Sequence, residues 1–262
     1  MSAELALALF RKSVLKQVKY HRITALLDDP VGQRCLDIGA DNGVISLLLR
    51  RRGGRWASAD LDEQTVASIR ELVGDDVHRL DGARTPFPGQ AFDQVVVVDY
   101  LEHIADDARF ADELARILKP GGRVIVNVPH LKPRSLLNRV RHAIGLTDEW
   151  HGHLRPGYSL EGIRGLLGPR FVIEQSVTYS KAFSELVDTA LNGLYLAMQR
   201  GAGDSPGSAK GTVVTQADIR KHRKQFLLLS GLYPLLWGIS RLDALLWLQP
   251  GYKLIVRARL AS

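Results

Sequence analysis

The run Phe92–Val98, written FDQVVVV, constrains the fold of this chain more than any other segment. Four consecutive valines without polar alternation are typical of a strand that is buried on both faces of a parallel sheet. Parallel strands are joined by crossover connections, usually helices, that cover the two faces of the sheet. The chain is therefore expected to supply several further strands that alternate with helices.

That alternation is present on both sides of the valine run. We predict strands at 34–38, 56–59, 77–80 and 123–128, with helices at 43–52, 63–72 and 106–118. Lys119–Gly122, with the sequence KPGG, ends the last of these helices. The sequence therefore predicts an α/β fold with a doubly wound, Rossmann-like sheet.

The remaining segments predict a helical N-terminus and a helical insertion late in the chain. Helices are expected at 5–27, 159–167, 183–199, 216–231 and 234–248, strands at 171–179 and 252–260, and loops at 130–157 and 201–211. We divide the chain into an N-terminal helical segment (1–30), a core (31–179), a helical insertion (180–250) and a final strand that closes the core sheet (251–262).

Composition excludes several classes of protein. Hydrophobic residues make up 45% of the chain, which excludes global disorder, and the single cysteine, Cys35, excludes a disulfide framework or a multi-cysteine metal site. The net charge of +7 is compatible with nucleic acid, an anionic membrane or a phosphorylated substrate and identifies none of them. The N-terminus lacks the features of a secretory signal, and no apolar stretch reaches the roughly 18 residues of a spanning helix. We expect a cytoplasmic protein.

Carboxylates follow four of the predicted strands. They are Asp37, Asp60, Asp81 and Asp99. Because ligands of open parallel sheets bind beyond the carboxyl ends of the strands, we expect these side chains to share one binding edge. They favour a cationic ligand with several hydrogen-bond donors, such as hydroxyls and amines, although each could instead be an ordinary loop acid. The pyrophosphate fingerprint GxGxxG is absent after the first strand.

Five stretches in this order resemble the class I S-adenosylmethionine-dependent methyltransferases. They are LDIGADNG (36–43), ADLD (59–62), LDGARTPFP (80–88), FDQVVVVDYLEHI (92–104) and LKPGGRVIVNVP (118–129). The resemblance implies a seven-stranded sheet, S-adenosylmethionine as the cofactor and methyl transfer as the activity. It continues more loosely through HLRPGYSLEGIRGLL (153–167), as in members that act on small molecules.

The resemblance also implies which residues bind the cofactor. The glycine-rich stretch beside the methionine moiety corresponds to Asp37, Gly39, Ala40 and Gly43, with Asp41 in place of the family's middle glycine. Asp60 with Leu61 corresponds to the family position that binds the ribose hydroxyls, and Asp81 with Gly82 to the position near the adenine amine. Asp99 with Tyr100 corresponds to the position that faces the sulfonium. Glu102 and His103 are expected to be structural or close to the cofactor rather than catalytic.

Methyl transfer from a sulfonium is an in-line displacement whose leaving group is already activated, so positioning can supply much of the catalysis. A general base helps when the acceptor is a hydroxyl. The candidates are His130, which follows the fifth strand, and His151 and His153 in the sequence WHGH. Each of them could equally be a solvent-facing loop histidine. We expect no metal, because no carboxylate lies at a convincing ligand spacing from these histidines.

The insertion at 180–250 is expected to cover the acceptor pocket and set its specificity. Leucines and the tryptophans Trp237 and Trp247 follow a basic run, Arg220–Lys224. This combination is typical of a helix at an anionic membrane surface, to which Arg134, Arg139 and Arg141 could add charge. The alternative is a lid that packs on its own core or on a second copy in a homodimer.

Three functions remain open. The first is a methyltransferase that acts on oxygen or nitrogen of a small, hydrophobic or lipid-linked acceptor, peripheral to the inner face of a membrane. The second is an RNA or protein methyltransferase; nucleic acid is disfavoured because the basic residues are dispersed and Asp99–Glu102 (DYLE) replaces the motif of enzymes that methylate amide or base nitrogens. The third is a cofactor-binding protein without catalytic activity.

Overall fold

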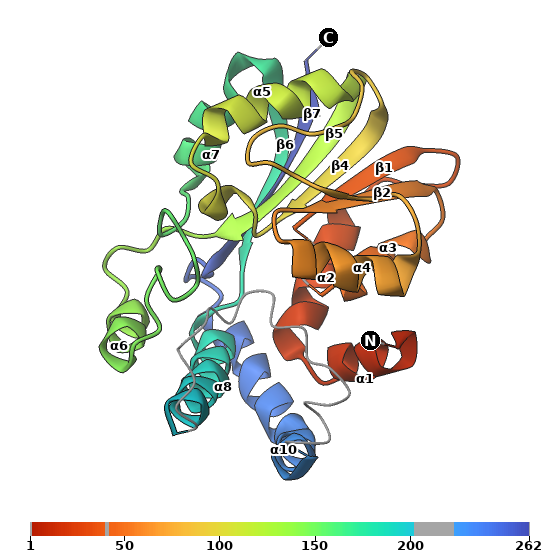
Figure 1. Ribbon diagram of the computed structural model, residues 1–262. Coiled ribbons are helices and arrows are strands. Elements are labelled where there is room, and N and C mark those ends of the chain that lie inside the picture. The colour runs from red at the N-terminus through yellow and green to blue at the C-terminus, as the bar shows by residue number, and fades with distance from the viewer. Residues whose placement is uncertain (1, 40–41, 202–222, 262) are drawn as a thin grey trace.

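The computed structural model describes residues 2–39, 42–201 and 223–261, and a seven-stranded sheet lies at its centre (Figure 1). The strands are β1 (Arg34–Ile38), β2 (Arg55–Asp60), β3 (Val77–Arg79), β4 (Phe92–Val98), β5 (Leu118–Pro129), β6 (Phe171–Tyr179) and β7 (Lys253–Leu260). Their order is β3-β2-β1-β4-β5-β7-β6; β1 to β5 run parallel, and β7 is antiparallel to both β5 and β6. The predicted α/β fold with a doubly wound sheet is confirmed.

Helices cover both faces of this sheet. They are α1 (Ala3–Arg11), α2 (Val14–Leu26), α3 (Val44–Arg50), α4 (Glu63–Val73), α5 (Asp107–Ile117), α6 (Leu136–Ile144), α7 (Leu160–Leu167), α8 (Ala182–Gly201) and α10 (Arg223–Arg241), with single turns at η1 (Leu101–His103), η2 (Gly168–Arg170) and η3 (Leu242–Leu246). The core between α5, α7 and the sheet is separate from the core beneath α1, α2 and α3.

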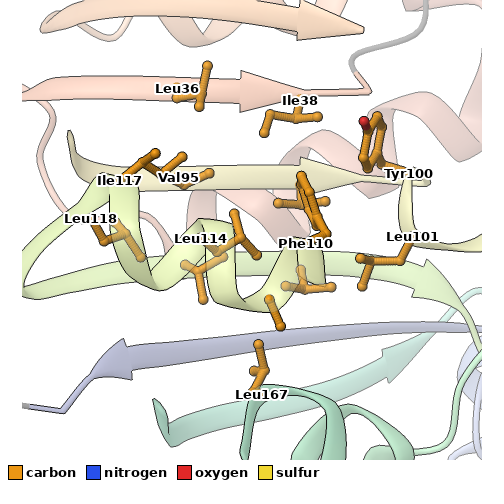
Figure 2. Close-up of a cluster of buried hydrophobic side chains, with 14 of the residues drawn as sticks. Leu36, Ile38, Val95, Tyr100, Leu101, Phe110, Leu114, Ile117, Leu118 and Leu167 are labelled. Atoms are coloured by element: carbon orange, nitrogen blue, oxygen red, sulfur yellow. The ribbon is translucent and has the colours of Figure 1, made fainter. Parts of the chain in front are cut away.

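The valines of β4 point alternately into these two cores. Val95 and Val97 pack with α5, as Figure 2 shows for Val95, whereas Val96 and Val98 pack on the opposite face. Each of the four is at most 1% exposed. Burial on both faces explains why the sequence of this strand shows no polar alternation.

Two helical segments differ from the sequence prediction. The predicted helix at 5–27 is two helices, because Ser13 leaves the helical conformation and its hydroxyl accepts a hydrogen bond from the amide of Lys16 at the start of α2. The predicted loop at 130–157 contains α6, with Ser135 as its N-cap and Gly145 in the left-handed conformation at its end. Both capping residues were visible in the sequence.

The end of the helical segment at 180–250 also differs from the prediction. α10 continues through Pro234, where the sequence predicted a break between two helices. Pro234 lies on the exposed side of the helix. The predicted loop at 201–211 and the first residues of the helix at 216–231 lie outside the described residues.

α8, α10 and η3 follow β6 in the chain and precede β7. α8 packs against α10 and α6, and all three helices gather beyond the end of the sheet toward which β5 points (Figure 1). Within the described residues, no helix combines the length and apolar character needed to cross a membrane. The division of the chain into four segments stays a prediction.

A buried ionic cluster ties β1 to β2 and α3. The carboxylate of Asp37 is fully buried and accepts hydrogen bonds from the hydroxyls of Ser46 (2.5 Å) and Ser58 (2.7 Å), while a guanidinium nitrogen of Arg50 lies 3.4 Å away. Burial raises the pKa of Asp37, and the charge of Arg50 and the hydroxyls counteract this effect.

We predict that Asp37→Ala lowers the free energy of unfolding by about 3–5 kcal/mol, because it removes one partner of a buried ion pair. Asp37→Asn, which keeps an oxygen acceptor for the serines, should lose less. Urea unfolding without cofactor measures both, with Asp75→Asn on the surface as the control. Equal stability of the alanine variant and the wild type would contradict this account.

Candidate active site

The turn between β1 and α3 is pressed tightly against its neighbours. Gly39 and Gly43 have φ angles of 78° and 86°, in the left-handed region that favours glycine. A Cβ atom on Gly39 would lie 2.2 Å from the carbonyl oxygen of Val98, and one on Gly43 would lie 2.8 Å from the Cα of Ile69. Both glycines are therefore required by packing. Ala40, predicted to bind the cofactor, lies outside the described residues.

Asp60 is fixed at the end of β2. Its side chain accepts hydrogen bonds from the backbone amides of Leu61 (2.7 Å) and Asp62 (3.3 Å), and the residue is 7% exposed. Leu61 itself is partly buried against the core. The amides hold the carboxylate in one orientation at the edge of the sheet, and its role toward ribose hydroxyls stays a prediction.

Tyr100 ties the end of β4 to the segment after β3 that carries Asp81 and Gly82. Its hydroxyl donates a hydrogen bond to the carbonyl of Gly82 (2.6 Å), and its ring is 1% exposed. Burial raises the pKa of Tyr100, and the charges of Asp60 and Asp81 raise it further. Tyr100 itself is engaged with backbone and core.

Asp37 lies differently from these residues. Its oxygens face Ser46, Ser58 and Arg50 beneath the turn. This placement differs from the direct cofactor contact that the resemblance implied. We expect Asp37 to act on the site by holding the β1–α3 turn in place.

Asp99, directly after β4, is the meeting point of several elements. It adopts a left-handed conformation with φ 45°, and its carboxylate accepts a hydrogen bond from the amide of Asn127 (3.0 Å). The ammonium of Lys19, from α2, makes a close ion pair with it, and that of Lys253, from β7, lies 3.8 Å away. Neither lysine was expected from the sequence, because nothing near them marks a site.

A cavity of about 450 Å³ opens beside Gly39 and Asp99. Its walls come from the segment after β5, from α6 and α8, and from the start of β7. It therefore lies between the 130–157 segment and the helices after β6, where the acceptor was expected. Most of the residues that line it are charged or histidines, and prolines and leucines contribute further apolar surface.

All three histidines predicted as candidate bases line this cavity. The Nδ1 atom of His130 lies 2.8 Å from the carbonyl oxygen of Gly251. His151 and His153 stack with ring centroids 5.2 Å apart, and His153 also meets the ring of His103 at 4.9 Å. The structure therefore brings His103 into the group, although the sequence did not favour it.

A second charged group faces the cavity from α6 and α8. A guanidinium nitrogen of Arg141 lies 2.7 Å from the carboxylate of Glu185, and Asp188 lies 3.9 Å from the same guanidinium. Burial and the charge of Glu185 raise the pKa of Asp188 to about 6. Burial alone would lower the pKa of Lys253, but nearby carboxylates, Asp99 first among them, outweigh it and raise the pKa. No pattern in the sequence indicated this network.

Comparison with known proteins agrees with this geometry. Residues 36–126 match a family described as a methyltransferase domain. A demethylmenaquinone methyltransferase of Clavibacter sepedonicus is 34% identical over 41% of this chain and 46% of its own length. A ubiquinone biosynthesis O-methyltransferase of Marinobacter nauticus is 29% identical over 51% of this chain and 62% of its own length. The chain thus spans about half the length of these curated relatives.

Solved structures agree over a longer part of the chain. A [4+2]-cyclase, SpnF, superposes with a TM-score of 0.61, at 19% identity over 94% of this chain and 81% of its own. The cyclopropane synthase MmaA2 of Mycobacterium tuberculosis gives a TM-score of 0.58, at 16% identity over 94% and 84%. At these identities the similarity shows the fold alone.

The domain matched at residues 36–126 and the parallel sheet closed by an antiparallel β7 support a class I S-adenosylmethionine-dependent methyltransferase. The family, the fold and S-adenosylmethionine as the cofactor, all predicted from the resemblance, are thereby confirmed. The role of each individual site residue stays a prediction.

We predict that Asp60→Asn weakens binding of S-adenosylhomocysteine about 10- to 100-fold, because hydrogen bonds to a charged group contribute roughly 1.5–3 kcal/mol. Isothermal titration calorimetry measures this, with Glu63→Gln, an exposed neighbour, as the control. An Asp60→Asn protein with wild-type affinity would remove Asp60 from the cofactor site.

Proposed function

We propose that this protein transfers a methyl group from S-adenosylmethionine to an oxygen of a small acceptor with a polar head and an apolar part. The observation that carries the proposal is the cavity beside Gly39 and Asp99, which adjoins the methionine end of the proposed cofactor site. Relatives named for demethylmenaquinone and ubiquinone biosynthesis support an acceptor of this kind.

The chain's own residues would act mainly by positioning. S-adenosylmethionine, when bound, supplies an electrophilic methyl group on a positively charged sulfur. Asp60 and Asp81 would hold its nucleoside, and the turn around Gly39 would hold its methionine part. The wall after β5 would then aim the acceptor oxygen at the methyl group, and ordering two reactants in this way can supply about 7–11 kcal/mol of the barrier.

A histidine would take the proton of the acceptor hydroxyl. His130, His151 and His153 all face the cavity, so each can reach an acceptor there. His153 is 15% exposed, and its Nδ1 lies 3.7 Å from a carboxylate oxygen of Asp148.

We predict that His153→Ala lowers turnover about 10²- to 10⁴-fold while the affinity for S-adenosylhomocysteine persists. Formation of S-adenosylhomocysteine is followed with a panel of dihydroxylated aromatic acceptors, short-chain prenylated ones included, and His21→Ala on the surface is the control. Unchanged turnover would remove His153 from the reaction.

The same assay separates the competing functions. Turnover on RNA or protein but not on the aromatic panel would favour the second class of acceptor. Tight cofactor binding without turnover on any acceptor would favour a protein without catalytic activity. Transfer to an amine analogue but not to hydroxyls would replace oxygen by nitrogen as the acceptor atom.

We further propose peripheral contact with an anionic membrane. Large apolar side chains are exposed along the end of α10 and just beyond it, including Leu235 (61%), Trp237 (48%) and Trp247 (75%). On α6, Leu136 and further apolar residues are exposed beside Arg134 and Arg139. Apolar and basic side chains side by side suit the interface of an anionic bilayer.

Not every arginine contributes to this surface. Arg141 is bound to Glu185 inside the protein. The predicted basic run at 220–224 lies partly outside the described residues, and no side chain of it is described. In the alternative, these apolar side chains are buried between two copies of the chain in a homodimer. The same experiment distinguishes the dimer from the membrane.

We predict that the protein floats with vesicles containing phosphatidylglycerol and that Trp237→Ser with Trp247→Ser reduces the floating fraction several-fold. Vesicles of phosphatidylcholine alone and Val31→Ser, an exposed apolar residue elsewhere on the surface, are the controls. Absence of flotation, with a dimer that the double variant dissociates, would replace the membrane by a second subunit.

A further inference from the structure

Three side chains of types that can bind metal ions lie together in the lining of the acceptor cavity. A carboxylate oxygen of Glu102 and one ring nitrogen each of His103 and His153 lie within 4.8 Å of one another. The side chain of Glu102 is fully buried, and those of His103 and His153 are 8% and 15% exposed. We propose that Glu102, His103 and His153 bind a divalent transition-metal ion that holds the acceptor hydroxyl; this proposal rests on the proposed function.

The backbone holds the three residues together. η1 places Glu102 and His103 side by side immediately after Asp99 and Tyr100. The amide of Leu154 donates a hydrogen bond to the carbonyl of Glu102 (2.8 Å), which fixes the neighbouring His153 against η1. The cluster is therefore built on two anchored segments and does not depend on the chance orientation of surface side chains.

The ring of His103 is oriented as a metal ligand would be. Its Nδ1 lies 2.8 Å from the carbonyl oxygen of Gly152. Because a carbonyl can only accept, Nδ1 carries the hydrogen, and in the neutral ring Nε2 is then the atom with a lone pair. Nε2 lies 3.9 Å from a carboxylate oxygen of Glu102. Metal-bound histidines usually donate their second N–H to a carbonyl or carboxylate in this way.

The spacing fits an ion of the proposed class. Transition-metal ions bind imidazole nitrogen and carboxylate oxygen at roughly 2.0–2.2 Å, so that ligand atoms around one ion lie about 3–4 Å apart. Small side-chain rotations bring atoms within 4.8 Å to that separation. Two imidazoles and one carboxylate favour manganese, iron, cobalt, nickel or zinc over calcium or magnesium, which prefer oxygen ligands.

Three protein ligands leave positions open toward the cavity. An ion there would lower the pKa of an acceptor hydroxyl, whose proton passes to His130 or His151 in the same cavity, and would orient its oxygen. The oxygen then forms its bond to the methyl carbon as the carbon–sulfur bond breaks, and the electron pair of that bond stays on sulfur, which becomes neutral. The proposal therefore favours acceptors with a hydroxyl, above all two adjacent oxygens that can chelate the ion.

A competing explanation assigns Glu102 a purely electrostatic role. Lys253 faces the same cavity, and Glu102 is among the carboxylates that raise its pKa. In that case Glu102 balances the charge of Lys253, and the histidines act only as bases. The two explanations differ in whether the protein binds a metal ion at all, which can be measured without any acceptor.

The test uses the full chain, purified with a chelator and saturated with S-adenosylhomocysteine, and Co²⁺ as the probe. We expect one equivalent of Co²⁺ to bind, with d–d absorption bands typical of nitrogen and oxygen ligands. His103→Ala and His153→Ala should each weaken binding at least 10-fold, and Glu102→Gln should do the same. His21→Ala, on the surface of α2, is the matched control and should bind as the wild type does.

Calorimetry with S-adenosylhomocysteine on every variant shows whether the variant is folded. Wild-type protein that binds S-adenosylhomocysteine but not Co²⁺ or Mn²⁺ below about 1 mM would overturn the metal site and leave the proposed function standing. Co²⁺ binding that survives in all three variants would also overturn it. Methyl transfer at full rate after chelation would assign the histidines to base catalysis alone. Failure to bind S-adenosylhomocysteine would instead count against the proposed function.

Discussion

The carboxylate of Asp99 holds three distant parts of the chain at one point. Lys19 reaches it from the N-terminal helices, Asn127 from β5 and Lys253 from β7. Charges removed from water need such partners, since an unpaired buried charge is strongly destabilising. The left-handed conformation of Asp99 is itself unfavourable by an order of 1 kcal/mol or more. The conformation of Asp99 is therefore stable only when α2, β5 and β7 are packed around it. Asp99 and its two lysines also line the cavity.

Polar and apolar surfaces are separated in this protein. Most residues that line the cavity are charged or histidines, whereas large apolar side chains are exposed on α6, on α10 and just after α10. A purely apolar acceptor would cover the charged and histidine side chains that line the cavity without offering them hydrogen bonds, which is unfavourable. A molecule with a polar reacting head and an apolar tail matches both surfaces, because its tail can stay outside the charged part of the cavity.

The sequence predicted those parts of the fold whose signals are local. Burial of β4 on both faces leaves a run of valines, and strand ends leave acids such as Asp60 and Asp81. Caps at Ser13 and Ser135 were equally local and could have corrected the helix boundaries. The long-range partners of the site could not be predicted in this way. Lys19 looks like any other lysine on an amphipathic helix until α2 is placed beside the end of β4.

The segment around Gly152 and His153, which lines the cavity, also orients the ring of His103. Gly152 has a φ of 69°, and this left-handed turn aims its carbonyl at the ring of His103, 49 residues earlier in the chain. The next residue, His153, lies beside the same ring. A larger residue at position 152 would strain the turn and release His103, so the orientation and tautomer of that ring depend on backbone geometry elsewhere. The spacing of residues along the sequence does not indicate this long-range contact. For that reason the sequence predicted Glu102 and His103 to be structural or close to the cofactor.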